Sequence, residues 1–437
     1  MGTGDMKLER KVLPNGMVLL AVANSASPAA HIRCLLSAGA AFDEGRPGLA
    51  CLAARLLDAG TKNRSRAEIY EEVDSLGAIL SISEARETVS LDVHFLAKDF
   101  PRVVEILSDI LVSPMFPEEE LERRRAALVT SILTDAQDTE AVCENRLNAE
   151  IFPSSHPYHH PIKGSEESVR AITRDDVATF SRKFHTPQRS ILALSGDLEA
   201  GEALARLAAA MSRDGVESER TSVDFPAPDA LDEPVRVIAS LPDKSQADIG
   251  FGHRGLRRSD PDYYPFLVMN HALGRSGTGG RLGTEIREKR GLAYYAYSAF
   301  AAGIGAGAFL VRAGVNPARV DAAVECIFSE LRRVAAEGVT EAEVEESKQY
   351  LIGSLPRRLE TPAGIARHLA DAERLELGAD YTERFPELVG AVSVSDCRRV
   401  AGSRLEPDQG ALVIVGPPKG EAGKSGSAIA ERLTRSV

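Results

Sequence analysis

Apolar residues in the first half of the chain fall into short runs and into longer periodic stretches. The short runs predict strands near 17–23, 31–37, 79–83, 88–95 and 190–195. The periodic stretches predict helices near 48–57, 67–76, 100–112, 117–133 and 175–184. Strands grouped with pairs of helices are typical of an α+β fold, with helices packed on a mostly antiparallel sheet.

The second half repeats this order of elements. It predicts strands near 235–239, 247–251 and 308–313, and helices near 264–274, 317–336, 341–355 and 361–375. Between them, residues 282–289 predict a helix that Gly291 ends, and 294–298 predict a strand.

The residues themselves repeat as well. Residues 30–61 align without a gap to 247–278, at a constant offset of 217, and 172–197 align to 392–417 at an offset of 220. Identical pairs include Ile32 and Ile249, Asp43 and Asp260, Leu56 and Leu273, and Asp176 and Asp396. Two collinear blocks with one apolar pattern indicate an internal duplication. We therefore expect two homologous α+β domains, at 1–211 and 234–437, joined by the polar linker 212–233.

Composition narrows the classes of function. The net charge of −12 argues against a nucleic-acid or anionic-membrane binder. No apolar run reaches the roughly 18–20 residues that span a bilayer. The five cysteines are scattered and form no C-x-x-C, which favours reduced thiols and a cytoplasmic protein.

One motif in the second half is specific. Residues 281–294 read RLGTEIREKRGLAY, and the first half carries LPNG at 13–16, PGLA at 47–50 and HPYHHPIKG at 156–164. In this order the chain resembles the pitrilysin, insulinase and mitochondrial-processing-peptidase family of zinc metallopeptidases, from about residue 8 to residue 417.

The resemblance implies that each chain folds as half of a clamshell. The first domain of the family supplies zinc, and the second supplies an arginine and a tyrosine seven residues apart that reach the substrate. These two map onto Arg287 and Tyr294. A guanidinium can bind a carbonyl or carboxylate through two hydrogen bonds, and a phenol can donate to a developing oxyanion.

The zinc motif itself is missing. The family's H-x-x-E-H maps onto residues 51–55, where Cys51, Ala54 and Arg55 replace both histidines and the general base. The third ligand falls at about Ser131. One thiolate is not a zinc site, and a guanidinium ~4 Å from a divalent ion would oppose binding by roughly 8 kcal/mol at an effective dielectric of about 20. We predict no metal and no cofactor in this chain.

The remaining histidines offer little chemistry. His156, His159 and His160 lie in the HPYHHPIKG segment, which predicts an exposed structural loop. His271 lies on the duplicate of the metal helix without a histidine four residues on, which favours a core or capping role.

Three hypotheses follow. The first is a zinc-free subunit, inactive alone, that contributes Arg287 and Tyr294 to a homologous H-x-x-E-H subunit acting on peptides, with zinc in that partner. The second is a structural or binding relative without a proteolytic role. The third, a free-standing enzyme with a relocated metal, is disfavoured by the ligand inventory. A homodimer remains open beside a heterodimer.

Overall fold

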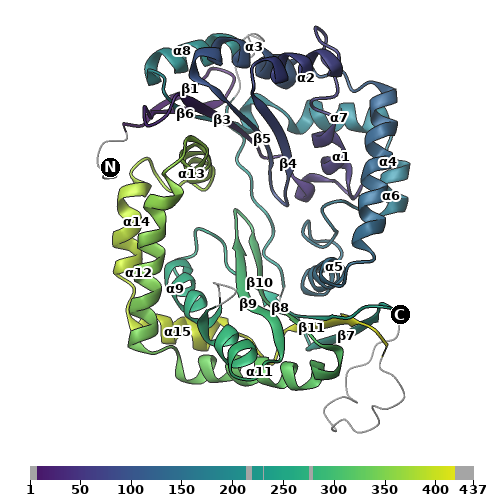
Figure 1. Ribbon diagram of the computed structural model, residues 1–437, viewed down its shortest axis with the longest axis vertical. Helices are drawn as coiled ribbons and strands as arrows, with labels where there is room; N and C mark the ends of the chain where they lie inside the picture. The colour runs from purple at the N-terminus through teal and green to yellow at the C-terminus, as the bar shows by residue number, and fades with distance from the viewer. Residues whose placement is uncertain (1–6, 213–218, 230, 275–278, 419–437) are drawn as a thin grey trace. The chain divides into compact units, whose positions relative to one another are not determined.

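The computed structural model describes residues 7–212, 219–229, 231–274 and 279–418 (Figure 1). It divides into two compact units. Unit 1 comprises Met1–Ile132, Pro161–Val223 and Ser354–Glu383, and unit 2 comprises Leu133–His160, Asp224–Gly353 and Arg384–Val437. The predicted boundaries at 211 and 234 follow the repeat and stay a prediction. The compact units do not coincide with the two halves of the sequence. Unit 1 includes Ser354–Glu383 of the second half, and unit 2 includes Leu133–His160 of the first half.

Unit 1 is built on a six-stranded sheet in the order β1-β2-β6-β3-β5-β4. Its strands are β1 (Glu9–Val12), β2 (Val18–Ala23), β3 (Ala29–Leu36), β4 (Ile79–Glu84), β5 (Val89–Leu96) and β6 (Ser190–Gly196). Only β2 and β6 pair in parallel; the other neighbours are antiparallel.

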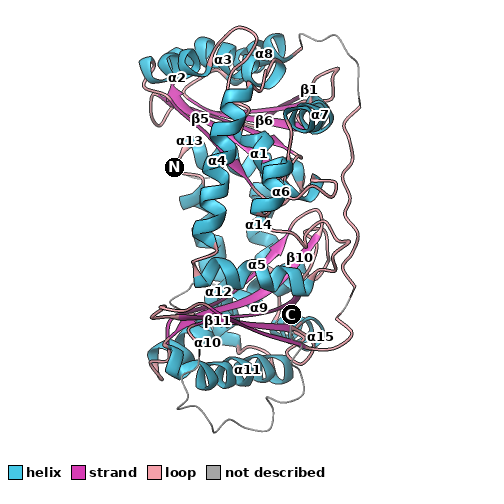
Figure 2. Cartoon of the chain, turned by 90° about the vertical axis from the view of Figure 1, so that its right-hand side faces the viewer, coloured by secondary structure: helices cyan, strands magenta, loops and turns pink. Residues whose placement is uncertain are grey.

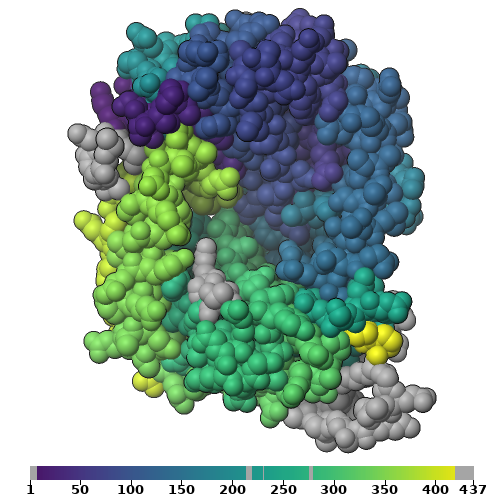
Figure 3. Space-filling view, viewed as in Figure 1, coloured from purple at the N-terminus to yellow at the C-terminus, as the bar shows by residue number. Residues whose placement is uncertain are grey.

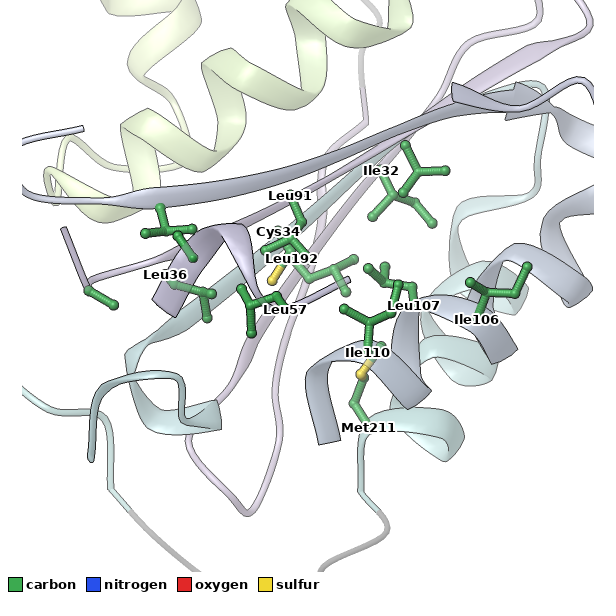
Figure 4. Close-up of a cluster of buried hydrophobic side chains, with 14 of the residues drawn as sticks. Ile32, Cys34, Leu36, Leu57, Leu91, Ile106, Leu107, Ile110, Leu192 and Met211 are labelled. Atoms are coloured by element: carbon green, nitrogen blue, oxygen red, sulfur yellow. The ribbon is translucent and has the colours of Figure 1, made fainter. Parts of the chain in front are cut away.

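The helices of unit 1 bury most of its core against one face of this sheet. They are α1 (Leu49–Arg55), α2 (Arg66–Ser75), α3 (Phe100–Val112), most of α4 (Glu118–Asp135), α6 (Glu166–Ala171), α7 (Arg174–Phe184) and α8 (Ala200–Met211). Figure 2 shows α2, α3 and α8 over the strands. Between the layers, Ile32 and Leu91 of the sheet meet Ile106 and Leu107 of α3 (Figure 4).

Unit 2 repeats the plan with a five-stranded sheet in the order β7-β11-β8-β10-β9. Its strands are β7 (Val235–Ser240), β8 (Ala247–Arg254), β9 (Ala293–Ala302), β10 (Ala306–Val315) and β11 (Ala411–Gly416). Its helices are α5 (Thr139–Ile151), α9 (Tyr263–Gly274), α10 (Gly280–Leu282), the π-helical turn η5 (Gly283–Glu288), α11 (Val320–Glu337), most of α12 (Glu341–Arg358), most of α14 (Tyr381–Gly390) and α15 (Val394–Arg404). Again one pair, β7 with β11, is parallel.

Each sheet has a second face, and a helix from the other half of the sequence covers it. In unit 1 this helix is α13 (Pro362–Arg374), which packs on β3 and β6. Its Ala366 and Ala370 complete a small apolar cluster with Val18, Leu20, Leu35, Ile191 and Ala193. In unit 2 the corresponding helix is α5, which packs on β8 and β11.

The two units confirm the predicted fold class. Strand for strand, β7-β11-β8-β10-β9 corresponds to β2-β6-β3-β5-β4, and β1 has no counterpart among the described strands of unit 2. Even the helix caps repeat. Thr173 and Asp176 form a capping box at the start of α7, and Ser393 and Asp396 form one at the start of α15. In the described part of the chain, no helix is both long and apolar enough for a membrane span.

Candidate functional site

Helix α1 of unit 1 begins after a backbone turn that requires glycine. Gly48 precedes it with φ 92°, and a Cβ there would lie 2.6 Å from the Lys163 carbonyl oxygen. The Asp43 carboxylate caps the turn, accepting hydrogen bonds from the backbone N–H groups of Gly48 (2.9 Å) and Ala50 (2.7 Å). Every residue of α1 except Arg55 is buried, so this helix is part of the core.

At the predicted zinc positions of α1, the side chains form an ion pair and a hydrogen bond with one glutamate. Arg55 donates from Nε to Glu84 Oε1 of β4 at 2.8 Å, and the Cys51 thiol lies 3.1 Å from the same oxygen. Both charged side chains are mostly covered, with 27% of Arg55 and 15% of Glu84 exposed. Burial and then the charge of Glu84 raise the pKa of the Cys51 thiol far above its ordinary value. Cys51 is therefore a neutral thiol that donates toward the Glu84 carboxylate.

The fourth predicted zinc position also faces a cation. Ser131 of α4 accepts a hydrogen bond from Lys163 Nζ at 2.8 Å, and both residues are half-buried. The locus thus holds a guanidinium and an ammonium in place of ligands. Across the residues that the structure describes, no group of three or more His, Cys, Asp or Glu side chains could hold a metal ion. These side chains do not fit zinc, because they supply cations where the ion needs donors.

In unit 2, the segment after α9 returns to the helix by a close backbone contact. A Cβ on Gly280, which has φ 74°, would lie 2.8 Å from Gly274 Cα, so glycine is required at this approach. Residues 275–278, between these two glycines, lie outside the described residues. The buried side chains of Leu282 and Ile286 then anchor the segment to the core.

The predicted helix at 282–289 is a π-helical turn instead. Its backbone shows the wider spacing, since Lys289 N–H donates to the Thr284 carbonyl at 3.0 Å. Such turns are rare and occur often at functional sites. Arg287 lies on this turn and is exposed.

Tyr294 lies at a β-bulge. In the pairing of β9 with β10, Ala293 opposes Val315 and Tyr295 opposes Gly314, so Tyr294 is the extra residue. Its side chain is 62% exposed. The neighbouring Tyr295 instead donates a hydrogen bond to the buried carboxylate of Asp248. The bulge therefore separates a structural tyrosine from an exposed one.

Arg287 and Tyr294 share one further property. Counting only described residues, neither side chain has a hydrogen bond or an ion pair. The turn η5 packs against β9, so the two predicted residues lie on adjoining elements of one unit. In Figure 3 much of the visible surface of unit 2 is green, the colour of the middle of the second half of the chain. An exposed cation and an exposed phenol without internal partners are available to an external ligand.

The histidines have structural roles. His156 is buried, and its Nε2 lies 3.0 Å from the Pro226 carbonyl; the expectation that it is exposed was wrong, because its ring stacks on Phe152. His159 Nδ1 lies 2.8 Å from the Phe152 carbonyl. His271 contacts Ser347 Oγ through Nδ1 at 3.1 Å.

Two residues of the zinc locus could not be found from the motif. Glu84 comes from β4, 29 residues after Arg55, and Lys163 lies next to the end of the segment 156–164, which predicts only a loop. The signal for Glu84 was the arginine itself, since a half-buried guanidinium on a core helix needs a carboxylate. The signal for Lys163 was weaker, because its partner Ser131 is neutral.

Comparison with known proteins gives the wider relationship. Residues 18–162 match the family model described as insulinase (peptidase family M16), and residues 171–351 match the model described as peptidase M16 inactive domain. An uncharacterized zinc protease of Streptomyces coelicolor is 27% identical, over 83% of this chain and 79% of its own length. A protein of Helicobacter pylori named non-peptidase homolog YmxG is also 27% identical, over 74% of each chain.

A solved structure agrees with the fold. The crystal structure described as peptidase M16 inactive domain from Pseudomonas fluorescens superposes with a TM-score of 0.88, at 22% identity, over 95% of this chain and 98% of that one. The relatives thus include proteins named for protease activity and one named for its absence.

Proposed function

Because this chain belongs to the insulinase family of peptidases, M16, we propose that it is the zinc-free subunit of a two-subunit metallopeptidase. A homologous H-x-x-E-H subunit supplies zinc and the general base. This chain supplies Arg287 and Tyr294 and is inactive alone. The substrate is a peptide.

The observation that carries this proposal is the contrast between the two sites. In unit 1 the zinc positions make internal contacts instead: Arg55 pairs with Glu84, and Ser131 accepts a hydrogen bond from Lys163. In unit 2 Arg287 and Tyr294 are exposed on a π turn and a bulge. General loss of function would leave no reason to keep two irregular backbone features beside exposed polar side chains.

The chemistry assigned to this chain is substrate binding. Arg287 binds a carbonyl or carboxylate oxygen of the peptide through its paired N–H donors. Tyr294 donates its phenolic proton in a hydrogen bond to the oxygen that becomes negative when water attacks the scissile carbonyl. Neither step needs a metal held by this chain.

The test begins by purifying the chain from its own cells and identifying any H-x-x-E-H homologue that co-purifies. Peptide hydrolysis by the pure mixture should fall about 10²–10³-fold on Tyr294→Phe, the effect of losing one oxyanion donor. Tyr350→Phe is the matched control, because Tyr350 is another exposed tyrosine of unit 2, at 50% against 62% for Tyr294. Unchanged hydrolysis with both Tyr294→Phe and Arg287→Ala would refute the proposal.

The name of the H. pylori relative favours a second candidate, a binding or structural protein without a proteolytic role. It predicts that the chain co-purifies with partners whose sequences lack H-x-x-E-H, or only with itself. The mass of the native complex and the sequences of its members separate the two candidates.

A further inference from the structure

The π turn that carries Arg287 is fastened at its start by one ion pair. Arg281 donates from Nε to Glu343 Oε1 at 2.7 Å and from a terminal nitrogen to Glu343 Oε2 at 2.8 Å. Only 12% of the Arg281 side chain and 28% of Glu343 are exposed. This two-bond, half-buried geometry is the strong form of the interaction.

Glu343 is itself held in place. Its carboxylate accepts hydrogen bonds from the backbone N–H of Thr340 (2.7 Å) and from the Thr340 hydroxyl (2.8 Å), which completes the cap of α12. Burial alone would raise the pKa of Glu343, but the hydrogen bonds from Arg281 and Thr340 lower it to about 2. The carboxylate therefore stays charged at any pH above about 4.

The turn needs such an external anchor. A π-helical turn is rare and occurs mostly as a single turn within an α-helix, whereas this one follows a helix of only three residues. Three backbone bonds close this one: Lys289 N–H to Thr284, Gly291 N–H to Arg287, and Leu292 N–H to Ile286. The buried side chains of Leu282 and Ile286 hold the turn against the core, but they do not fix how the turn is rotated about its own axis.

We propose that Arg281 and Glu343 are positioning residues, whose ion pair ties the π turn to α12 and thereby holds Arg287 and Tyr294 in their exposed orientation. They act through the turn and touch no substrate. That Arg287 and Tyr294 act on a peptide rests on the proposed function; the placement of the turn does not.

The direct test is amide hydrogen exchange on the full chain. Arg281→Met keeps the apolar stem and removes the charge, and it should speed exchange at Lys289, Gly291 and Leu292 about tenfold. The ladder between β8 and β10 should be unchanged, which shows that the unit still folds. Arg281→Lys should recover part of the protection. Arg332→Met is the control, because its pair with Asp408 lies exposed in the same unit.

The second test uses the active mixture with an H-x-x-E-H subunit. Arg281→Met should raise KM or lower kcat as the Arg287 and Tyr294 variants do, and Arg281→Lys should restore part of the loss. Exchange no faster than in Arg332→Met overturns the proposal. So does unchanged hydrolysis in Arg281→Met while Tyr294→Phe is impaired. If Tyr294→Phe has no effect, the proposed function fails and exchange alone decides the placement.

Discussion

The element that follows the metal-helix position differs between the units, although both come from one duplicated sequence. In unit 1 it is α2, a regular helix with a Ser65–Glu68 capping box, and β4 then pairs with β5 without a break in register. In unit 2 the short helix α10 and then the π turn η5 take this place, and β9 bulges at Tyr294. The π turn and the bulge thus occur at the two exposed residues of the predicted site, Arg287 and Tyr294.

The charges differ in the same sense. At the degenerate zinc positions of unit 1, Arg55 pairs with Glu84 and Lys163 donates to the Ser131 hydroxyl, whereas Arg287 has no side-chain partner among the described residues. The polar groups at the first position are thus satisfied within the chain, and Arg287 is not. Variants in unit 1 and in unit 2 can each test this contrast.

The largest effect should come from rebuilding the zinc site in unit 1. The variant Cys51→His, Ala54→Glu, Arg55→His and Ser131→Glu should bind about one equivalent of zinc, because it restores the donors and removes a repulsion of roughly 8 kcal/mol. Zinc per chain is measured by elemental analysis after dialysis. The same variant with Arg55 retained is the control and should bind none. Absence of zinc in the full variant would mean that the four positions do not converge.

A smaller loss should follow when the internal pair is broken. Arg55→Met leaves the Glu84 carboxylate largely buried without its cation, and should cost about 1–3 kcal/mol in urea unfolding. Arg170→Met removes an exposed pair with Glu166 of the same unit and should cost under about 0.5 kcal/mol. Equal losses in the two variants would show that the Arg55 pair is not a structural replacement for zinc.

Unit 1 should also show a dependence of stability on pH that arises from Asp43. Burial raises the pKa of Asp43 to about 7, against hydrogen bonds from Ala50 and Gly48 that lower it. The folded state then keeps a proton that the unfolded chain has released, so stability falls as pH rises from about 4 to 7, by roughly 3–4 kcal/mol. Unfolding midpoints at pH 5 and pH 8 measure this slope. Asp43→Asn should flatten it, and a slope that survives must come from another group.

The smallest effect is the most diagnostic for unit 2. Tyr294→Phe should leave the unfolding free energy within about 0.5 kcal/mol, because the hydroxyl is exposed and has no partner in the described structure. Tyr295→Phe, one residue on, should be destabilising, since it removes the hydrogen bond to buried Asp248. A large loss for Tyr294→Phe would make it a structural residue like its neighbour.

Local pattern was enough to predict much of this fold. The duplication, α1, β4 and the strand after Gly291 follow from periodicity and turn residues, and the solved relatives agree on the architecture. The π turn could not be predicted, because its sequence has the same apolar spacing as an α-helix. The bulge at Tyr294 depends on the register with β10, which no local pattern sets.

The candidate site divides in the same way. Arg287 and Tyr294 come from contiguous sequence and were identifiable, although their role stays a prediction. Glu84, Lys163 and Glu343 reach their partners across 29, 32 and 62 residues, so only the fold brings them together. The sequence also does not predict on which sheet α5 and α13 pack, because the pattern of an amphipathic helix shows which of its faces is buried but not what that face contacts.

The placement of α13 has a consequence for synthesis. The second face of the unit 1 sheet, with Val18 and Leu20, is covered by α13 through Ala366, Ala370 and the partly buried Leu369. At about 5–20 residues per second, the ribosome needs roughly 8–30 s to travel from residue 223 to residue 374. During that interval the nascent sheet exposes an apolar face, the kind of surface that chaperones bind. A gene cut between the halves would therefore yield two fragments, each without the helix that covers one face of its sheet.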